Sequence, residues 1–166
     1  MPCLAAALDA RQVTGLITGC REAGVLARIL HEQRGVLNHS NVSAAWVCMA
    51  RIGNRGRDGG EVREVVAAIQ NETRGVLNQM DGRQIANTIH SIARLHLRGV
   101  RADPELLAAI QRRAAATSGG FKPQDVANVL WALETMGETA DRGLLEACML
   151  RNLPPPMVQL PSIFLH

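Results

Sequence analysis

The feature that most constrains this chain is an internal repeat with a period near forty residues. The string EQRGVLN at 32–38 recurs as ETRGVLN at 72–78. Helical segments of one type recur at nearly the same step: NVSAAWVCMARIG (41–53), QIANTIHSIARLH (84–96) and DVANVLWALETMG (125–137). A second type of helical segment alternates with them, at 22–33, 61–72, 103–116 and 141–152. Two helices per unit predict an all-α fold, an α-solenoid of about 3.5 helix-turn-helix repeats of roughly 40 residues.

Each helix of the first type carries an apolar stripe at helical spacing. The three stripes are Val42, Ala45, Trp46, Met49, Ile52; then Ile85, Thr88, Ile89, Ile92, Leu95; then Val126, Val129, Leu130, Leu133, Met136. Helices this short are unstable alone in water, so the stripes are expected to be buried against neighbouring helices. Capping residues and first-turn prolines mark helix starts at Asp81, Asp103–Pro104 and Pro123, and glycines mark helix ends at Gly53, Gly99 and Gly137.

These signals divide the chain into a helical array with a short segment at each end. We expect an N-terminal lead-in at 1–14, four units at about 15–39, 40–79, 80–119 and 120–153, and a Pro-rich tail at 154–166. A solenoid needs polar capping units at its ends, and neither MPCLAAAL nor MVQLPSIFLH is polar. We therefore expect exposed apolar ends, as in a fragment of a longer array or a subunit held by other proteins.

Composition agrees with a helical protein and narrows its possible partners. Only 2% of the residues are aromatic, which disfavours an all-β fold. The net charge is +3, and since Lys122 is the one lysine among 18 Lys and Arg residues, 17 are Arg. Arginine suits phosphate and nucleobase recognition, although a GC-rich genome would explain the same bias. Four widely spaced cysteines predict neither a disulfide framework nor a zinc site, and no apolar run is long enough to span a membrane.

The third repeat has the most specific motif. FKPQDVANVLWALETMG (121–137) resembles the first-helix signature of octotricopeptide repeat proteins, and the corresponding segments before it are similar but looser. The resemblance covers roughly residues 15–156 and extends to FAST-kinase-like proteins and to helical subunits of RNA-editing substrate-binding complexes. It implies a sequence-selective RNA-binding adaptor that acts in transcript stability, processing, splicing or translation in a mitochondrion or chloroplast. The start of the chain has no clear transit peptide, so a cytosolic protein is the alternative.

Candidate RNA contacts lie opposite the apolar stripes. On this face Asn87 and Asn128 are suited to base edges, and His90 and Trp131 offer planar surfaces for stacking. The alternatives are that the asparagines bond the backbone of an adjacent unit, that Trp131 packs between units, and that His90 is an ordinary surface histidine. Ala44 and Val47 give the first copy no polar side chain for reading a base.

Arginines recur after the first helix of two successive units and predict a stripe along an RNA backbone. The set is Arg51, Arg55, Arg57, Arg94, Arg98 and Arg101, and the third unit breaks it with Glu134, Glu138 and Asp141. The alternative is a solvated charged face. If the stripe binds RNA, Arg51→Glu combined with Arg94→Glu is expected to abolish salt-sensitive binding.

The sequence carries no phosphate-binding loop, nucleophile elbow, HExxH or dinucleotide-binding fingerprint. We therefore expect no enzyme activity, no cofactor, no metal, no small-molecule substrate and no membrane partner. The partner expected is single-stranded RNA, an organellar transcript by the resemblance. Other protein subunits are the second class of partner. The competing hypothesis is a protein-binding α-solenoid scaffold or a structural subunit of a larger ribonucleoprotein, which an apolar groove would favour.

Overall fold

The computed structural model describes residues 8–53, 59–140 and 142–152, and within them the chain is all-helical with no strand. The predicted all-α class is confirmed for these residues. Three short 3-10 turns (34–36, 77–79 and 118–120) follow the second, fourth and sixth helices. The α-helices are α1 (Ala10–Gly19), α2 (Ala23–Glu32), α3 (His39–Ile52), α4 (Gly59–Val76), α5 (Gly82–His96), α6 (Pro104–Thr117), α7 (Pro123–Met136) and α8 (Arg142–Asn152).

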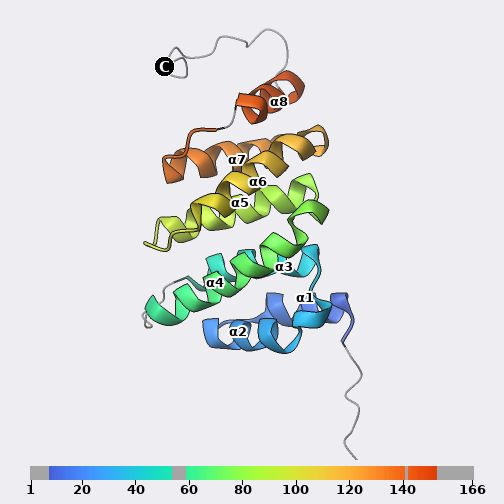
Figure 1. Cartoon of the computed structure of the whole chain (residues 1–166), viewed down its shortest axis with the longest axis vertical. Helices are drawn as coiled ribbons and strands as arrows, with labels where there is room; N and C mark the ends of the chain where they lie inside the picture. Colours follow the sequence, from blue (N-terminus) through green and yellow to red (C-terminus); the bar gives the residue numbers. More distant parts are fainter. Residues whose placement is uncertain (1–7, 54–58, 141, 153–166) are drawn as a thin grey trace, which may run out of the picture.

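The helices are arranged in two layers that run along the long axis of the molecule (Figure 1). In one layer α1 packs on α3, α3 on α5 and α5 on α7. In the other layer α2 packs on α4 and α6 packs on α8, while α3 contacts α4 and α5 contacts α6 across the layers. Helices of the first sequence type therefore pack on one another, although their sequences lie about forty residues apart.

The helix starts follow from local sequence. Asp9, Asn38 and Asp81 each form a capping box with the third residue of the helix that follows. Asp103 accepts hydrogen bonds from the amides of Glu105 and Leu106, ahead of Pro104. These bonds satisfy amide groups that have no acceptor within the helix. The helix start at Asp9 was not predicted, and α1 crosses the boundary expected at residue 14.

The predicted apolar stripes form most of the core, but not equally. The stripes of α3 and α5 are buried along their whole length, including the hydroxyl-bearing Thr88. Of the α7 stripe, only Val129 and Leu133 are buried, while Val126, Leu130 and Met136 remain partly exposed. The apolar stripe of α7 is thus covered less completely than the stripes of α3 and α5.

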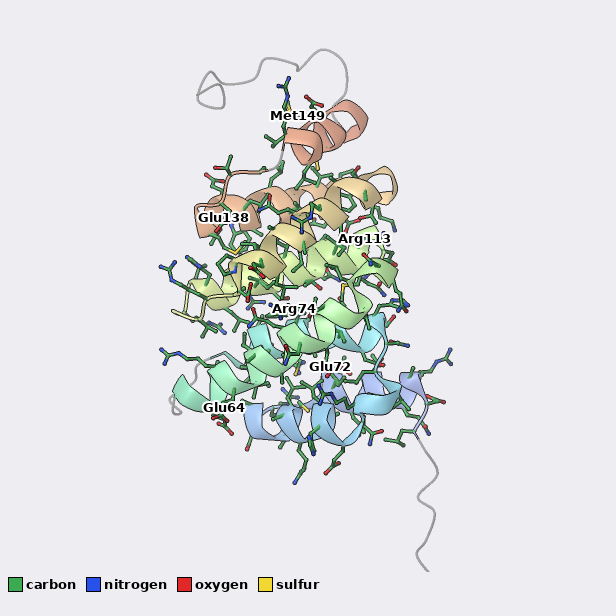
Figure 2. All side chains as sticks on the ribbon, viewed as in Figure 1. Glu64, Glu72, Arg74, Arg113, Glu138 and Met149 are labelled. Atoms are coloured by element: carbon green, nitrogen blue, oxygen red, sulfur yellow. The ribbon has the colours of Figure 1, made fainter. Side chains whose placement is uncertain are left out.

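Long polar side chains hold the layers and turns together at the surface. Arg113 on α6 donates through Nε and Nη2 to the carbonyl of Met80, at 3.2 and 2.8 Å. Arg74 on α4 forms a 2.9 Å ion pair with Asp103, the residue that caps α6. Figure 2 shows the labelled Arg74 and Arg113 on the successive helices of this layer. The Arg74–Asp103 pair is exposed to solvent, which screens its charges, so it orients the helices more than it stabilises them.

Candidate nucleic-acid interface

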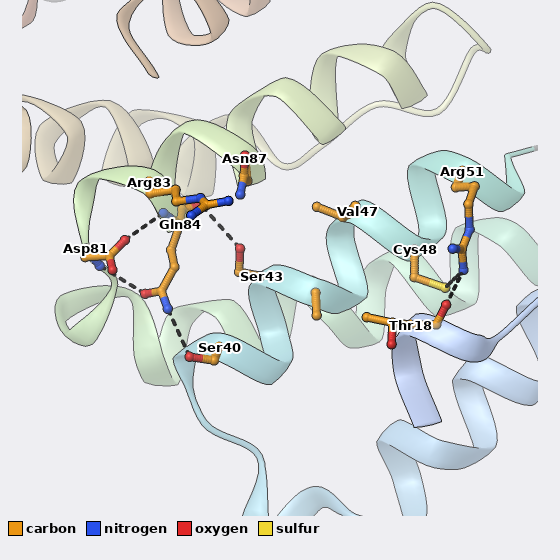
Figure 3. A pocket seen from close by; sticks show the side chains of 11 residues that line it. Thr18, Ser40, Ser43, Val47, Cys48, Arg51, Asp81, Arg83, Gln84 and Asn87 are labelled. Carbon is orange, nitrogen blue, oxygen red and sulfur yellow. Dashed lines mark hydrogen bonds between the residues drawn. The ribbon is translucent and has the colours of Figure 1, made fainter. Parts of the chain in front are cut away.

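A groove of about 470 Å³ lies over the exposed face of α3, between the end of α1 and the start of α5 (Figure 3). Its floor includes Ala44 and Val47, the two apolar positions that the sequence places opposite the α3 stripe. Val47 is 45% exposed. The remaining lining is largely polar and consists of Thr18, Ser40, Ser43, Cys48, Arg51, Asp81, Arg83, Gln84 and Asn87. The groove therefore has an apolar floor between two polar ends.

The first polar end is built around Gln84 at the start of α5. Its Nε2 donates to Ser40 Oγ at 3.0 Å, and its Oε1 lies 2.9 Å from His39 Nδ1. Ser43 Oγ donates to the Gln84 carbonyl at 3.4 Å. Gln84 also closes the capping box with Asp81, so one side chain both starts α5 and fixes it against α3.

The second polar end is built around Arg51. Its Nη2 donates to the carbonyl oxygens of Thr18 and Cys20, at 2.7 and 2.8 Å, and lies 3.5 Å from Cys48 Sγ. The last carbonyls of a helix have no donor within it and carry a partial negative charge, which a guanidinium stabilises. Arg51 is exposed, yet it is oriented along the end of α1, a role that the sequence did not predict.

Arg98 repeats this arrangement one helix further along the layer. Its Nη1 donates to the Ala50 carbonyl, near the end of α3, at 2.7 Å. The guanidinium passes directly over Gly53, whose backbone has a φ of +58°. Arg51 and Arg98, two of the arginines for which we predict a phosphate contact, thus donate to backbone carbonyls at or near the end of the preceding helix.

The other predicted arginines differ in their surroundings where the structure describes them. Arg94 is exposed on α5. Arg101 lines a separate cavity of about 100 Å³ together with His96 and Glu138. Arg55 and Arg57 lie outside the described residues.

His90 and Trp131 form a ring pair that joins α5 to α7. Their ring centroids lie 4.8 Å apart with the planes tilted by 43°, and Trp131 is 40% exposed. Burial lowers the pKa of His90, and the positive charge of Arg94 lowers it further. The neutral imidazole is therefore favoured, and an uncharged ring beside an indole leaves a planar, partly exposed surface next to a cation.

The two candidate asparagines have different surroundings. Asn87 lines the groove one turn before His90. Asn128 Oδ1 accepts a 2.9 Å hydrogen bond from Gln124 Nε2 on its own helix. The asparagine that bonds the adjacent helix is instead the buried Asn41, whose Nδ2 donates to Ala10 O at 2.7 Å and Thr14 Oγ1 at 2.8 Å. Asn41 is the third residue after the Asn38 cap, as Gln84 is after Asp81. This shared position was the signal in the sequence that could have predicted the contact of Asn41 with α1.

No family model and no curated protein matches this chain. Among the residues that the structure describes, no helix is both long and apolar enough to cross a membrane. The chemistry of the site is set by its own side chains. These offer hydrogen-bond donors, a cationic rim and a planar pair along α3, α5 and α7, all suited to binding a polar polymer.

Proposed function

We propose that this protein is an α-solenoid of about 3.5 helix-turn-helix repeats that binds single-stranded RNA along the layer formed by α1, α3, α5 and α7. The observation that carries the proposal is the continuous polar face of α5. Asn87 in the groove, His90 in the ring pair and the exposed Arg94 follow one another at helical spacing. An amide, a planar ring and a cation are the three groups that read or hold a nucleotide in single-stranded RNA.

Recurring contacts at both ends of the helices support a repeat architecture. At the amino ends, Asn41 bonds α1 and Gln84 bonds α3 from the same position of the capping box. At the carboxyl ends, Arg51 binds the end of α1 and Arg98 binds the end of α3. A solenoid is built from interfaces that each unit repeats with its neighbour, and these contacts are of that kind.

In the proposed complex, different side chains would contact the phosphate, the face of a base and the edge of a base. Arg83 at the groove and Arg94 on α5 are exposed and available to phosphate oxygens. The His90–Trp131 pair offers a stacking surface to a base, and Asn87 offers a donor and an acceptor to a base edge. No step in this scheme requires bond chemistry, so the protein would act as an adaptor and not as an enzyme.

The resemblance to octotricopeptide repeat proteins suggests where such an adaptor would act. By that resemblance its target would be an organellar transcript, and its role would lie in transcript stability, processing or translation. The motif at 121–137 falls on α7 and includes Trp131, so the most family-like segment contributes to the planar pair.

The test compares two double variants that remove the same charge from opposite layers. Arg83→Gln with Arg94→Gln removes two exposed cations from the proposed RNA face, and Arg63→Gln with Arg112→Gln removes two from α4 and α6. In fluorescence anisotropy with single-stranded RNA, the first variant is expected to bind more weakly. Its slope of log affinity against log salt should fall by about 0.7 for each phosphate that an arginine no longer neutralises. Equal weakening in both variants would contradict the proposed face.

A protein-binding scaffold is the second candidate, favoured by the apolar groove floor. Val47 is 45% exposed between the two polar ends, and Leu97, after α5, is 65% exposed. Apolar anchors of this kind are typical of peptide grooves. Crosslinking with recovery of bound RNA separates the candidates: no recovered RNA, with a protein crosslinked at Val47, would favour the scaffold.

A further inference from the structure

Cys20 and Cys48 form a thiol pair between α1 and α3, although they lie 28 residues apart in the sequence. Cys20 is the carboxyl cap of α1, and Cys48 lies in the middle of α3. Both side chains are buried. Cys48 Sγ donates to the Cys20 carbonyl at 3.7 Å, and Cys20 Sγ donates to the carbonyl of Leu16 at 3.3 Å.

The pair has a route to solvent and a cation beside it. Cys48 is part of the groove lining, next to Thr18 and Arg51 (Figure 3). Arg51 Nη2 bonds the Cys20 carbonyl and also lies 3.5 Å from Cys48 Sγ. A small oxidant in the groove would therefore reach Cys48 before Cys20. The Arg51 guanidinium lies beside Cys48 Sγ, where its positive charge would stabilise a thiolate.

We propose that Cys20 and Cys48 are a reversible oxidation site, at which a hydroperoxide converts the two thiols to a disulfide that joins α1 to α3. The Cys48 thiolate attacks the nearer peroxide oxygen and the O–O bond breaks. This step gives a sulfenic acid, and the distal oxygen takes up the proton that the Cys48 thiol released and leaves as water or an alcohol. The Cys20 thiol then attacks the sulfenic sulfur, an S–S bond forms and water leaves. A thiol reductant reverses the change by exchange.

The local electrostatics set the order of attack. Burial raises the pKa of both thiols, which protects them from indiscriminate oxidation. The charge of Arg51 acts in the opposite direction on both, and its hydrogen bond lowers the pKa of Cys48 as well. The contact between the two thiols raises the pKa of Cys20 and lowers that of Cys48, and this agrees with the position of Cys48 in the groove as the attacking group. A disulfide requires the two sulfurs to approach to about 2 Å, and the hydrogen bond from Cys48 Sγ to the Cys20 carbonyl already brings the two residues together.

Oxidation would change the groove as well as the core. A disulfide sulfur is a poorer hydrogen-bond partner than a thiol, so Arg51 would keep the carbonyls of Thr18 and Cys20 and lose its bond to Cys48. The new bond would also close a loop that contains α2 and hold α1 on α3 when the rest of the chain unfolds. The melting temperature of the oxidised protein should therefore be higher by several degrees.

The experiment uses the full chain with Cys3→Ser and Cys148→Ser, which leaves Cys20 and Cys48 as its two thiols. Treatment with hydrogen peroxide is expected to remove both titratable thiols, and the intact protein should lose the mass of two hydrogen atoms. Dithiothreitol should restore both. A gain of oxygen mass that persists, a disulfide-linked dimer or no reaction would each overturn the proposal.

Two further variants test the parts assigned to Cys48 and Arg51. Adding Cys48→Ser should abolish the loss of hydrogen mass and leave the buried Cys20 thiol titratable after peroxide treatment. In the two-thiol protein, Arg51→Gln should slow the oxidation several-fold, whereas Arg112→Gln on α6 should leave the rate unchanged. Equal rates in these two arginine variants would overturn the role assigned to Arg51.

Discussion

The indole Nε1 of Trp46 donates a 2.9 Å hydrogen bond to Thr73 Oγ1 in the interior between α3 and α4. Both residues are fully buried, and the Thr73 hydroxyl in turn donates a 2.7 Å hydrogen bond to the Ile69 carbonyl. The largest side chain of the core therefore has its polar atom satisfied, and the pair fixes how the two helices of one hairpin meet.

Removal of the Thr73 hydroxyl should be costly. Thr73→Val keeps the volume but leaves the Trp46 N–H buried without an acceptor, at a cost of about 1–3 kcal/mol in the free energy of unfolding. Urea denaturation followed by circular dichroism measures this cost. Thr73→Ser is the control, since it keeps the hydroxyl and loses one methyl group, for about 1 kcal/mol. A larger loss for Ser than for Val would show that packing, and not the hydrogen bond, dominates.

Gly53 and Gly137 offer a matched test of the arginine contact at the end of α3. Both have positive φ, +58° and +69°, but an added Cβ at Gly53 would collide with the Arg98 guanidinium, whereas at Gly137 it meets open space. Gly137→Ala should cost about 1–2 kcal/mol for the backbone alone. Gly53→Ala should lower the free energy of unfolding by about 1–3 kcal/mol, because its backbone conformation is essentially restricted to glycine. The displacement of Arg98 should add to this loss. Denaturation midpoints of the two variants check this, and equal losses would contradict the close contact.

Asn41 should hold α1 in place. Asn41→Ala removes its capping box and both bonds to α1, for an expected loss of about 1–3 kcal/mol, and amide hydrogens of α1 should exchange faster. Gln12→Ala is the control, because Gln12 occupies the same position of the α1 capping box but is exposed. If both variants speed exchange in α1 equally, the bonds between the helices contribute little.

His90 predicts a pH dependence on the acidic side of neutrality. Burial, and then the charge of Arg94, lowers its folded pKa below the ordinary value of 6.5. Above pH 6.5 the His90 imidazole is neutral in both the folded and the unfolded state, so it does not lower the stability of the fold. As the pH falls from 6.5 toward the folded pKa, the unfolded state gains the proton first, so stability decreases. In His90→Gln this decrease should be smaller, and in Arg94→Gln the His90 pKa measured by NMR should rise.

The positions of the helices could largely be predicted from sequence. The caps at Asp81 and Asp103, the prolines at 104 and 123 and the stripes of α3 and α5 act within a few residues. The helix at Ala10–Gly19 was not predicted because its copy of the pattern is weak: Gly15, a poor helix former, stands where the other units have Ala44, Asn87 and Asn128.

The site was less predictable, for a physical reason that Arg51 illustrates. Its type and spacing suggested a phosphate contact, and nothing near it in the sequence indicated that the end of α1 would lie within reach. The same holds for Arg98 over Gly53 and for Asn41 against Ala10. A side chain of one helix finds a carbonyl of another only after both helices have packed.

The sequence by itself determined the two helix types, their forty-residue period and the faces that become buried, because helical periodicity and capping are local properties of the chain. The tertiary structure alone decided which polar groups meet. It brought Cys20 to Cys48, His90 to Trp131 and Trp46 to Thr73, pairs separated by 27 to 41 residues. Such contacts depend on the distance and rotation between packed helices, which side-chain volumes across the whole interface set together and no short segment encodes.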